Sequence, residues 1–186
     1  MDVISAAEQI GKEMERIEKK RENAIILSRS IIRATKKIIH SIHIGEEYGT
    51  AVNDLKRDVL SLKDLEPELM HSAEDALMEY SETCIFAAVV EKRDVPTYSE
   101  LNVTPRAWAL GLADSLGEIR RMILNLLLAD DKKNVEYLFE RMETICEAVM
   151  SFDVPDAILP IRRKQDVARS VTEKTRTDLV YSSLRS

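Results

Sequence analysis

The chain has 186 residues, enough for one hydrophobic core and too few for two independent domains, so we expect a single domain over residues 1–186. Glycine and proline occur five times each, aromatic residues make up 5% of the chain and charged residues 32%, which disfavours a sheet-rich protein and is typical of an all-α fold. The net charge of −6 speaks at first sight against nucleic acid as a partner.

The charge is unevenly spread along the chain. Residues 1–45 carry nine Lys and Arg against six Asp and Glu, residues 159–186 carry seven against three, and the middle carries eleven against twenty-four. The three regions therefore have net charges of +3, +4 and −13. A polyanionic partner would have to contact the ends, with the central acids turned away from it or neutralised by metal.

No segment predicts export or insertion into a membrane. Charged residues come too early in the N-terminal segment for a signal peptide, and no apolar run approaches the roughly 18 residues of a membrane span. Cys84 and Cys146 lie within apolar helical patterns, where a thiol usually acts as a small hydrophobic group, so we expect no disulfide. These features predict a cytoplasmic protein without membrane contact.

The first predicted helix is long, from about Val3 to Ile44, and ends at Gly45, a residue that favours the left-handed position after a helix. In its second half, apolar and basic residues form stripes on opposite sides, and no acid occurs between Asn23 and Gly45. The basic stripe consists of Arg29, Arg33, Lys36 and His40. Solvated faces usually mix charges of both signs, so this stripe favours a phosphate-binding surface over an ordinary solvated face.

Further helices are expected at about residues 46–62, 68–92, 105–129, 130–152 and 159–184. Local signals set their limits: breaks at residues 64–67 and 153–160, an irregular loop at residues 93–103, and Thr104 as N-cap before Pro105 in the first turn. The last helix begins with three cations, which the helix dipole disfavours, so they are either surface variation or a functional exception. These three are Arg162, Arg163 and Lys164.

Two acids in the third predicted helix are the first candidate functional residues. Glu79 and Glu82 are three residues apart and therefore share one helix face. Along that face the pattern continues to Phe86 and Val89, which are core residues by type. The two acids are thus not part of a purely solvated face.

The fourth predicted helix carries the second acidic pair. It opens with an apolar run at residues 108–113, and Asp114 follows directly, where a carboxylate is costly unless it is paired or bound to a cation. Glu118 lies one turn later on the same face. Gly111 and Gly117 flank Asp114, and the pattern leaves open whether they make room for a ligand or for close helix packing.

Together the acids form an oxygen-only ligand set, consisting of Glu79, Glu82, Asp114 and Glu118. Such a set suits Mg²⁺, with Mn²⁺ as an alternative, and divalent ions held by carboxylates stabilise the attacking and leaving oxygens in phosphodiester cleavage. Both spacings are also common in charged helices, so ordinary solvated acids are the alternative. A di-iron bundle would need Glu-x-x-His on two helices, and the chain has one such motif, at residues 68–71.

Several of these motifs resemble the translin family, most closely its Trax (translin-associated factor X) branch. The matching segments are residues 21–43, Glu79-Tyr80-x-Glu82 and the string Thr104-Pro105…Leu110-Gly111-x-Ala113-Asp114-x-x-Gly117-Glu118. The resemblance implies an all-α subunit of six or seven antiparallel helices with a long N-terminal helix. Such subunits assemble, commonly as octamers, into a closed barrel around nucleic acid.

In Trax-like subunits, four acids that face the interior bind Mg²⁺ and cut RNA. The resemblance assigns these roles to Glu79, Glu82, Asp114 and Glu118. It also assigns nucleic-acid binding to Arg29, Arg33, Lys36, Lys37 and His40, and Arg121 fits the same pattern. The loop at residues 93–102 is shorter than the insertion of eukaryotic Trax proteins, which favours a compact homo-oligomer.

The function implied is that of a Mg²⁺-dependent endoribonuclease acting on single-stranded RNA or single-stranded regions, with DNA as a second candidate substrate. The alternative from a different class is a non-catalytic oligomer that binds single-stranded RNA or DNA, as translin does.

Overall fold

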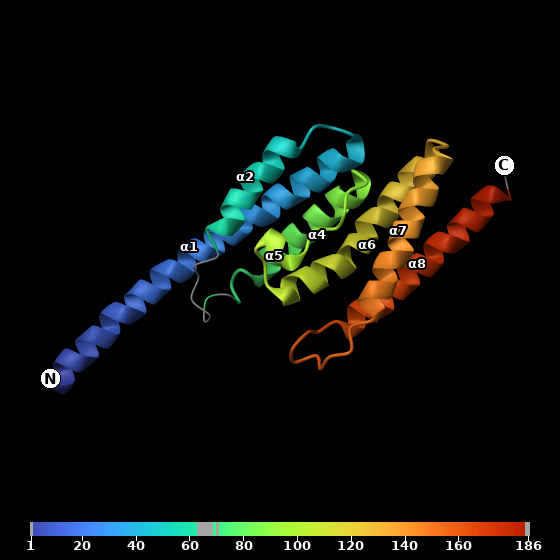
Figure 1. The fold of residues 1–186 in the computed structure, drawn as a ribbon. Coiled ribbons are helices and arrows are strands. Elements are labelled where there is room, and N and C mark those ends of the chain that lie inside the picture. Colours follow the sequence, from blue (N-terminus) through green and yellow to red (C-terminus); the bar gives the residue numbers. More distant parts are fainter. Residues whose placement is uncertain (1, 63–68, 70, 185–186) are drawn as a thin grey trace.

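The computed structural model describes residues 2–62, 69 and 71–184, which form a bundle of helices (Figure 1). The described helices are α1 (Val3–Ile44), α2 (Gly49–Leu60), α4 (Glu74–Val90), α5 (Tyr98–Leu101), α6 (Pro105–Leu128), α7 (Lys132–Met150) and α8 (Arg162–Ser183). This part of the chain contains no strand, so the all-α prediction is confirmed. None of the helices described is long and apolar enough to cross a membrane. The break predicted at residues 64–67 and the helix start predicted at residue 68 lie outside the described residues.

Local capping signals set the helix ends where they were predicted. Gly45 has φ 71°, in the left-handed region that glycine tolerates best, and its N–H donates back to carbonyls in the last turn of α1. At the start of α6, the Thr104 hydroxyl accepts a hydrogen bond of 3.0 Å from the Ala107 N–H, and Pro105 occupies the first turn. Both predicted caps are therefore confirmed.

The segment expected to be an irregular loop contains a short helix, so that prediction was wrong at Tyr98–Leu101. A capping box stabilises this helix, since Thr97 and Glu100 each bind the backbone N–H of the other. The segment is also tied to the bundle, because the Trp108 indole N–H donates to the Pro96 carbonyl at 2.8 Å. Both contacts come from side chains that satisfy backbone groups of a loop.

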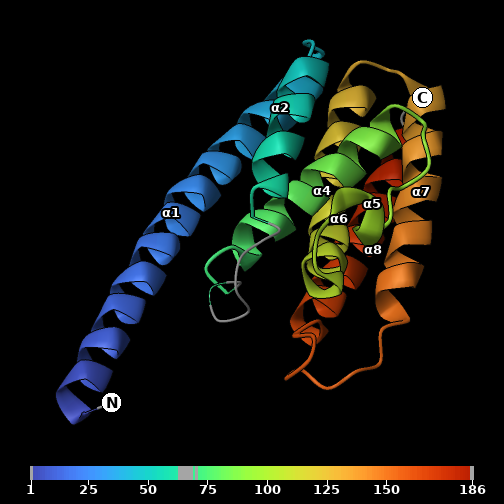
Figure 2. The same ribbon diagram turned by 60° about the vertical axis from the view of Figure 1, so that its left-hand side comes forward.

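The centre of the bundle is the pair α4 and α6, which pack side by side, with α1 against α4 and with α7 and α8 against α6 (Figures 1 and 2). The two central helices run in the same direction because residues 91–104 carry the chain back to the end from which α4 began. Accordingly, the Thr104 hydroxyl, which precedes α6, donates to Glu74 in the first turn of α4 at 2.9 Å. Parallel packing places corresponding turns of α4 and α6 side by side.

Gly111 allows the two central helices to approach closely. A Cβ atom at this position would lie 2.6 Å from the Met78 carbonyl oxygen and 2.8 Å from the Glu82 backbone nitrogen. Ser81 in the facing turn is fully buried, and its hydroxyl donates to the Leu77 carbonyl of its own helix at 2.7 Å. A Cβ at Gly117, by contrast, would meet nothing within 4 Å. Close packing therefore explains Gly111 and leaves Gly117 without a packing role.

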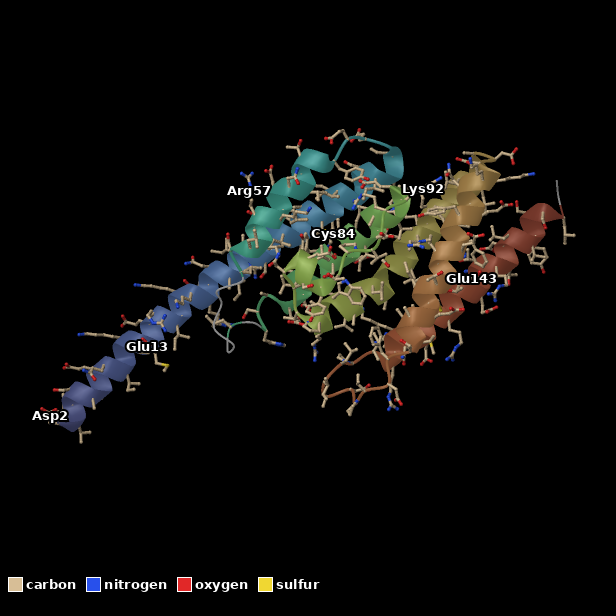
Figure 3. The ribbon with its side chains drawn as sticks, viewed as in Figure 1. Asp2, Glu13, Arg57, Cys84, Lys92 and Glu143 are labelled. Carbon is tan, nitrogen blue, oxygen red and sulfur yellow. The ribbon has the colours of Figure 1, made fainter. Side chains whose placement is uncertain are left out.

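The first half of α1 projects beyond the rest of the bundle (Figures 1 and 2). Figure 3 shows Asp2 and Glu13 on this projecting part, while the labelled Cys84 lies within the bundle. Residues 2–23 contain no buried side chain, and the buried positions of α1 begin at Ala24. The long helix thus contributes to the core of the bundle only in its second half.

Candidate functional site

The predicted acids and part of the basic stripe meet where α1, α4 and α6 come together. A pocket of about 470 Å³ is lined by Lys36, Ile39 and His40 from α1, Glu79 and Glu82 from α4, and Glu118 and Arg121 from α6. Asp114 is not among the lining residues, but it lies one turn before Glu118 on α6 and acts electrostatically on Glu82. The structure therefore gathers acids of α4 and α6 in one pocket with Lys36 of α1 and Arg121 of α6.

Helical spacing and parallel packing together produce this arrangement. Glu79 and Glu82 lie three residues apart on α4, and Asp114 and Glu118 lie four apart on α6, so each pair occupies one face. The close contact at Gly111 then sets the turn of α6 that carries Asp114 next to the turn of α4 that carries Glu82.

The acids influence one another electrostatically. Burial raises the pKa of Glu82 to about 8, and the negative charges of Asp114, Glu79 and Glu118 add to the rise. Burial also raises the pKa of Glu79, while the positive charge of Lys36 opposes that rise. The four carboxyl groups are therefore close enough to repel one another when ionised, and this repulsion makes their negative charge costly. A divalent cation would relieve this repulsion, and an all-oxygen donor set suits Mg²⁺.

Two of the acids are paired with cationic or imidazole groups of the same chain. The Lys164 Nζ of α8 lies 2.5 Å from both carboxylate oxygens of Asp114. The His43 Nε2 lies 2.5 Å from Glu118 Oε2, and Arg121 approaches the same oxygen at 3.7 Å. With the side chains placed in this way, no group of three or more His, Cys, Asp or Glu among the described residues is positioned to hold a metal ion. The metal site stays a prediction.

His43 was not among the residues predicted for the site. Its side chain is only 2% exposed, and its ring packs against Phe86 with the centroids 5.1 Å apart. Nδ1 has no hydrogen-bond partner, whereas Nε2 is the ring nitrogen that contacts Glu118. The spacing of Lys36, His40 and His43 on one face of α1 was the signal that could have identified it.

Lys164 was noted in the sequence only as one of three cations at the start of the last helix. The structure shows that it reaches Asp114, whereas Arg162 and Arg163 are exposed. The signal was therefore present, as a charge that the helix dipole disfavours, but the sequence did not identify its partner.

The remaining predicted residues lie away from the pocket. Arg29, Arg33 and Lys37 are exposed on α1 and do not line it. Arg29 and Arg33 occupy the two turns before Lys36, so the basic stripe leads along α1 into the pocket. In the motif considered for di-iron, His71 is exposed and residue 68 lies outside the described residues.

The raised pKa of Glu82 predicts that the metal-free protein loses stability as pH rises. The folded protein keeps a proton on this carboxyl at pH values where the unfolded chain, with its ordinary pKa of 4.5, has lost it. Unfolding then releases a proton, so the free energy of unfolding falls between about pH 4.5 and pH 8. We expect Glu82→Gln to flatten this decline and to melt above the wild type at about pH 8, measured by thermal unfolding in a metal chelator.

Glu147→Gln is the matched control, because Glu147 is an exposed glutamate on α7. Its melting temperature should follow the wild-type pH profile. Parallel profiles for the wild type and Glu82→Gln would contradict the assignment of this pH dependence to Glu82.

The chain is similar to several known proteins. No protein-family model matches it. The uncharacterized protein MJ0175 of Methanocaldococcus jannaschii is 31% identical over 166 residues, which cover 86% of this chain and 75% of that protein.

Three solved structures share the fold. The crystal structure of AfC3PO is 30% identical and superimposes with a TM-score of 0.88, covering 97% of this chain and 98% of that chain. The complex of AfC3PO with duplex RNA gives 29% identity and the same TM-score, with 97% of each chain covered. The structure of apo-NeC3PO, at 19% identity, has the same fold with a TM-score of 0.84 over 95% of this chain and 96% of that one. By its helical architecture and by these similarities, the chain belongs to the C3PO/translin family.

Proposed function

We propose that this protein is a Mg²⁺-dependent endoribonuclease that hydrolyses phosphodiester bonds of RNA. The observation that carries the proposal is the pocket in which acids of α4 and α6 lie together with Lys36 and His40 of the basic stripe. Metal-assisted phosphodiester cleavage uses both features, since cations hold the phosphate groups and carboxylates hold the divalent ion.

Each part of the pocket has a role in this reaction. Lys36 and Arg121 line the rim and would hold phosphate oxygens of the RNA, with Arg29 and Arg33 extending the contact along α1. Glu79, Glu82, Asp114 and Glu118 would hold the metal and orient the attacking water. Bound there, Mg²⁺ supplies an activated water and neutralises charge that develops on the phosphate.

The RNA partner is supported by family membership. AfC3PO, which matches nearly the whole of this chain, has been solved with duplex RNA. We propose that the present chain also binds RNA through the basic stripe of Arg29, Arg33, Lys36 and His40, with the neighbouring Lys37 as a further contact. Single-stranded RNA is the substrate expected from the family resemblance, and duplex RNA is the competing one.

A second candidate function is RNA binding without cleavage. Asp114 and Glu118 are already paired with Lys164 and His43, so the acids as placed do not form a ready metal cage. A protein that kept these pairs in the presence of Mg²⁺ would bind RNA through α1 alone.

One experiment separates the two functions. Labelled single-stranded and duplex RNA are incubated with the purified protein, with Mg²⁺ or with a metal chelator, and products and binding are measured together. Cleavage that needs Mg²⁺ supports the nuclease. Salt-sensitive binding without products, lost in an Arg29→Ala and Arg33→Ala double variant, supports the binding protein and refutes the nuclease.

We further propose that the protein is a homo-oligomer, an octamer as expected from the family resemblance. The projecting part of α1 continues the seven-residue pattern of its buried part. Val3, Ile10 and Ile17 are spaced by seven, and the same register leads to the buried Ala24 and Ile31. In this subunit Val3 and Ile10 are 85% and 60% exposed, so their face lacks the partner that the pattern predicts.

We expect light scattering to give a mass several times the 21.2 kDa of one chain. Ile10→Glu places a charge on the projecting apolar face and should reduce that mass, since a buried unpaired carboxylate is costly. Gln9→Glu adds the same charge on the neighbouring exposed residue and should leave the mass unchanged. Equal masses for Ile10→Glu and the wild type would show that this face is not an interface.

A further inference from the structure

Among the described lysines and arginines, Lys164 makes the shortest contact with the acids of the site. Its Nζ lies 2.5 Å from both oxygens of Asp114, so both oxygens contact the same ammonium group. The side chains are only 27% and 30% exposed, so the pair is partly withdrawn from water. Among the described helices, this contact links the α8 start to the middle of α6.

The position of Lys164 is unfavourable without Asp114. It lies in the first turn of α8, where the helix dipole disfavours positive charge, and Ile161 provides no side-chain cap. Arg162 meets the same dipole but is exposed and pairs with Asp156 at 3.5 Å. The Lys164 side chain instead turns inward. Its positive charge compensates the negative charge of the half-buried Asp114, which would otherwise lack a counter-ion.

The influence of Lys164 extends beyond Asp114. Its positive charge also acts on Glu79 and Glu82 of α4, favouring their ionised forms. It therefore lies close enough to act on acids of both central helices. A divalent cation bound by these acids would lie near the Lys164 ammonium group, and the two positive charges would repel each other.

We propose that Lys164 is the internal counter-ion of the carboxylate site, a positioning residue that holds Asp114 in the metal-free protein and competes with the divalent cation for it. This role rests on the proposed function, because it assumes that the acids bind metal. Metal binding then requires Asp114 to leave Lys164, which lowers the apparent affinity for the metal and keeps the acids stable without it.

The test compares Mn²⁺ binding and thermal stability in wild type, Lys164→Met, Lys164→Arg and Arg163→Met. Mn²⁺ alone is titrated into metal-free protein and followed by calorimetry and by the electron paramagnetic resonance signal of the free ion. We expect Lys164→Met to bind Mn²⁺ roughly tenfold more tightly and to melt at a lower temperature without metal. Lys164→Arg keeps the charge, although not the shape of the ammonium group, and should lie closer to the wild type than Lys164→Met does in both measurements. Arg163→Met removes a charge from the adjacent exposed residue and should change Mn²⁺ affinity by less than about twofold.

The outcomes distinguish this role from the proposed function. Equal or weaker Mn²⁺ binding by Lys164→Met, with a folded protein by circular dichroism, overturns the counter-ion role while leaving the nuclease open to its own test. Absence of Mn²⁺ binding in both wild type and Lys164→Met overturns the metal site and this role with it. Tighter binding by Lys164→Met in a protein that cleaves no RNA supports the counter-ion role and refutes the nuclease.

Discussion

Asp114→Asn is expected to reduce Mg²⁺-dependent RNA cleavage at least about a hundredfold while leaving RNA binding largely intact. The substitution keeps the shape of the side chain but replaces a carboxylate with an amide, which is a poor ligand for Mg²⁺. Asp114 acts electrostatically on both Glu79 and Glu82, so a metal ion bound by those two acids would also interact with Asp114. Cleavage rates are measured on labelled RNA, and binding is measured separately in a metal chelator.

The same substitution removes a partly buried ion pair, so a control for lost stability is needed. Asp178→Asn provides it, because Asp178 also pairs α8 with α6, through Arg120 at 2.7 Å, and neither residue lines the pocket. Both variants should melt somewhat below the wild type, but only Asp114→Asn should lose cleavage. Unchanged cleavage in Asp114→Asn would exclude this residue from the reaction.

Gly111→Ala is expected to lower the free energy of unfolding by about 2–4 kcal/mol. The added methyl group would lie 2.6 Å from a backbone oxygen and 2.8 Å from a backbone nitrogen of α4, and neither atom can move without shifting the helix. Alanine also raises helix propensity by about 1 kcal/mol, which offsets part of the clash. Separation of α4 from α6 should in addition weaken any metal binding that uses acids of both helices. Denaturant-induced unfolding and Mn²⁺ titration measure the two effects.

Gly117→Ala is the matched substitution on the same helix. Nothing lies within 4 Å of a Cβ atom there, so only the gain in helix propensity is expected, about 0.5–1 kcal/mol of added stability. If both glycine variants unfolded at the wild-type denaturant concentration, the α4–α6 contact would not be as close as the structure shows.

The sequence predicted those features that depend on neighbours within about one helical turn. Periodicity gave the all-α class and the full length of α1, and the residue types at Gly45 and Thr104 gave the helix ends. Spacing also placed each acidic pair on one helix face. The short helix Tyr98–Leu101 was not predicted, because its capping box lies in a segment with a proline and several polar residues, a composition that is typical of loops.

Only the tertiary structure decided how these local elements meet. The parallel direction of α4 and α6 depends on the path of residues 91–104, and helical periodicity carries no information about it. The same packing brings Lys164 to Asp114 and His43 to Glu118, pairs separated by 50 and 75 residues in the chain. The sequence therefore determined which helix faces carry charge. The relative direction and packing of the helices determined which charged residues became partners, because contacts between helices do not follow from residue spacing along one helix.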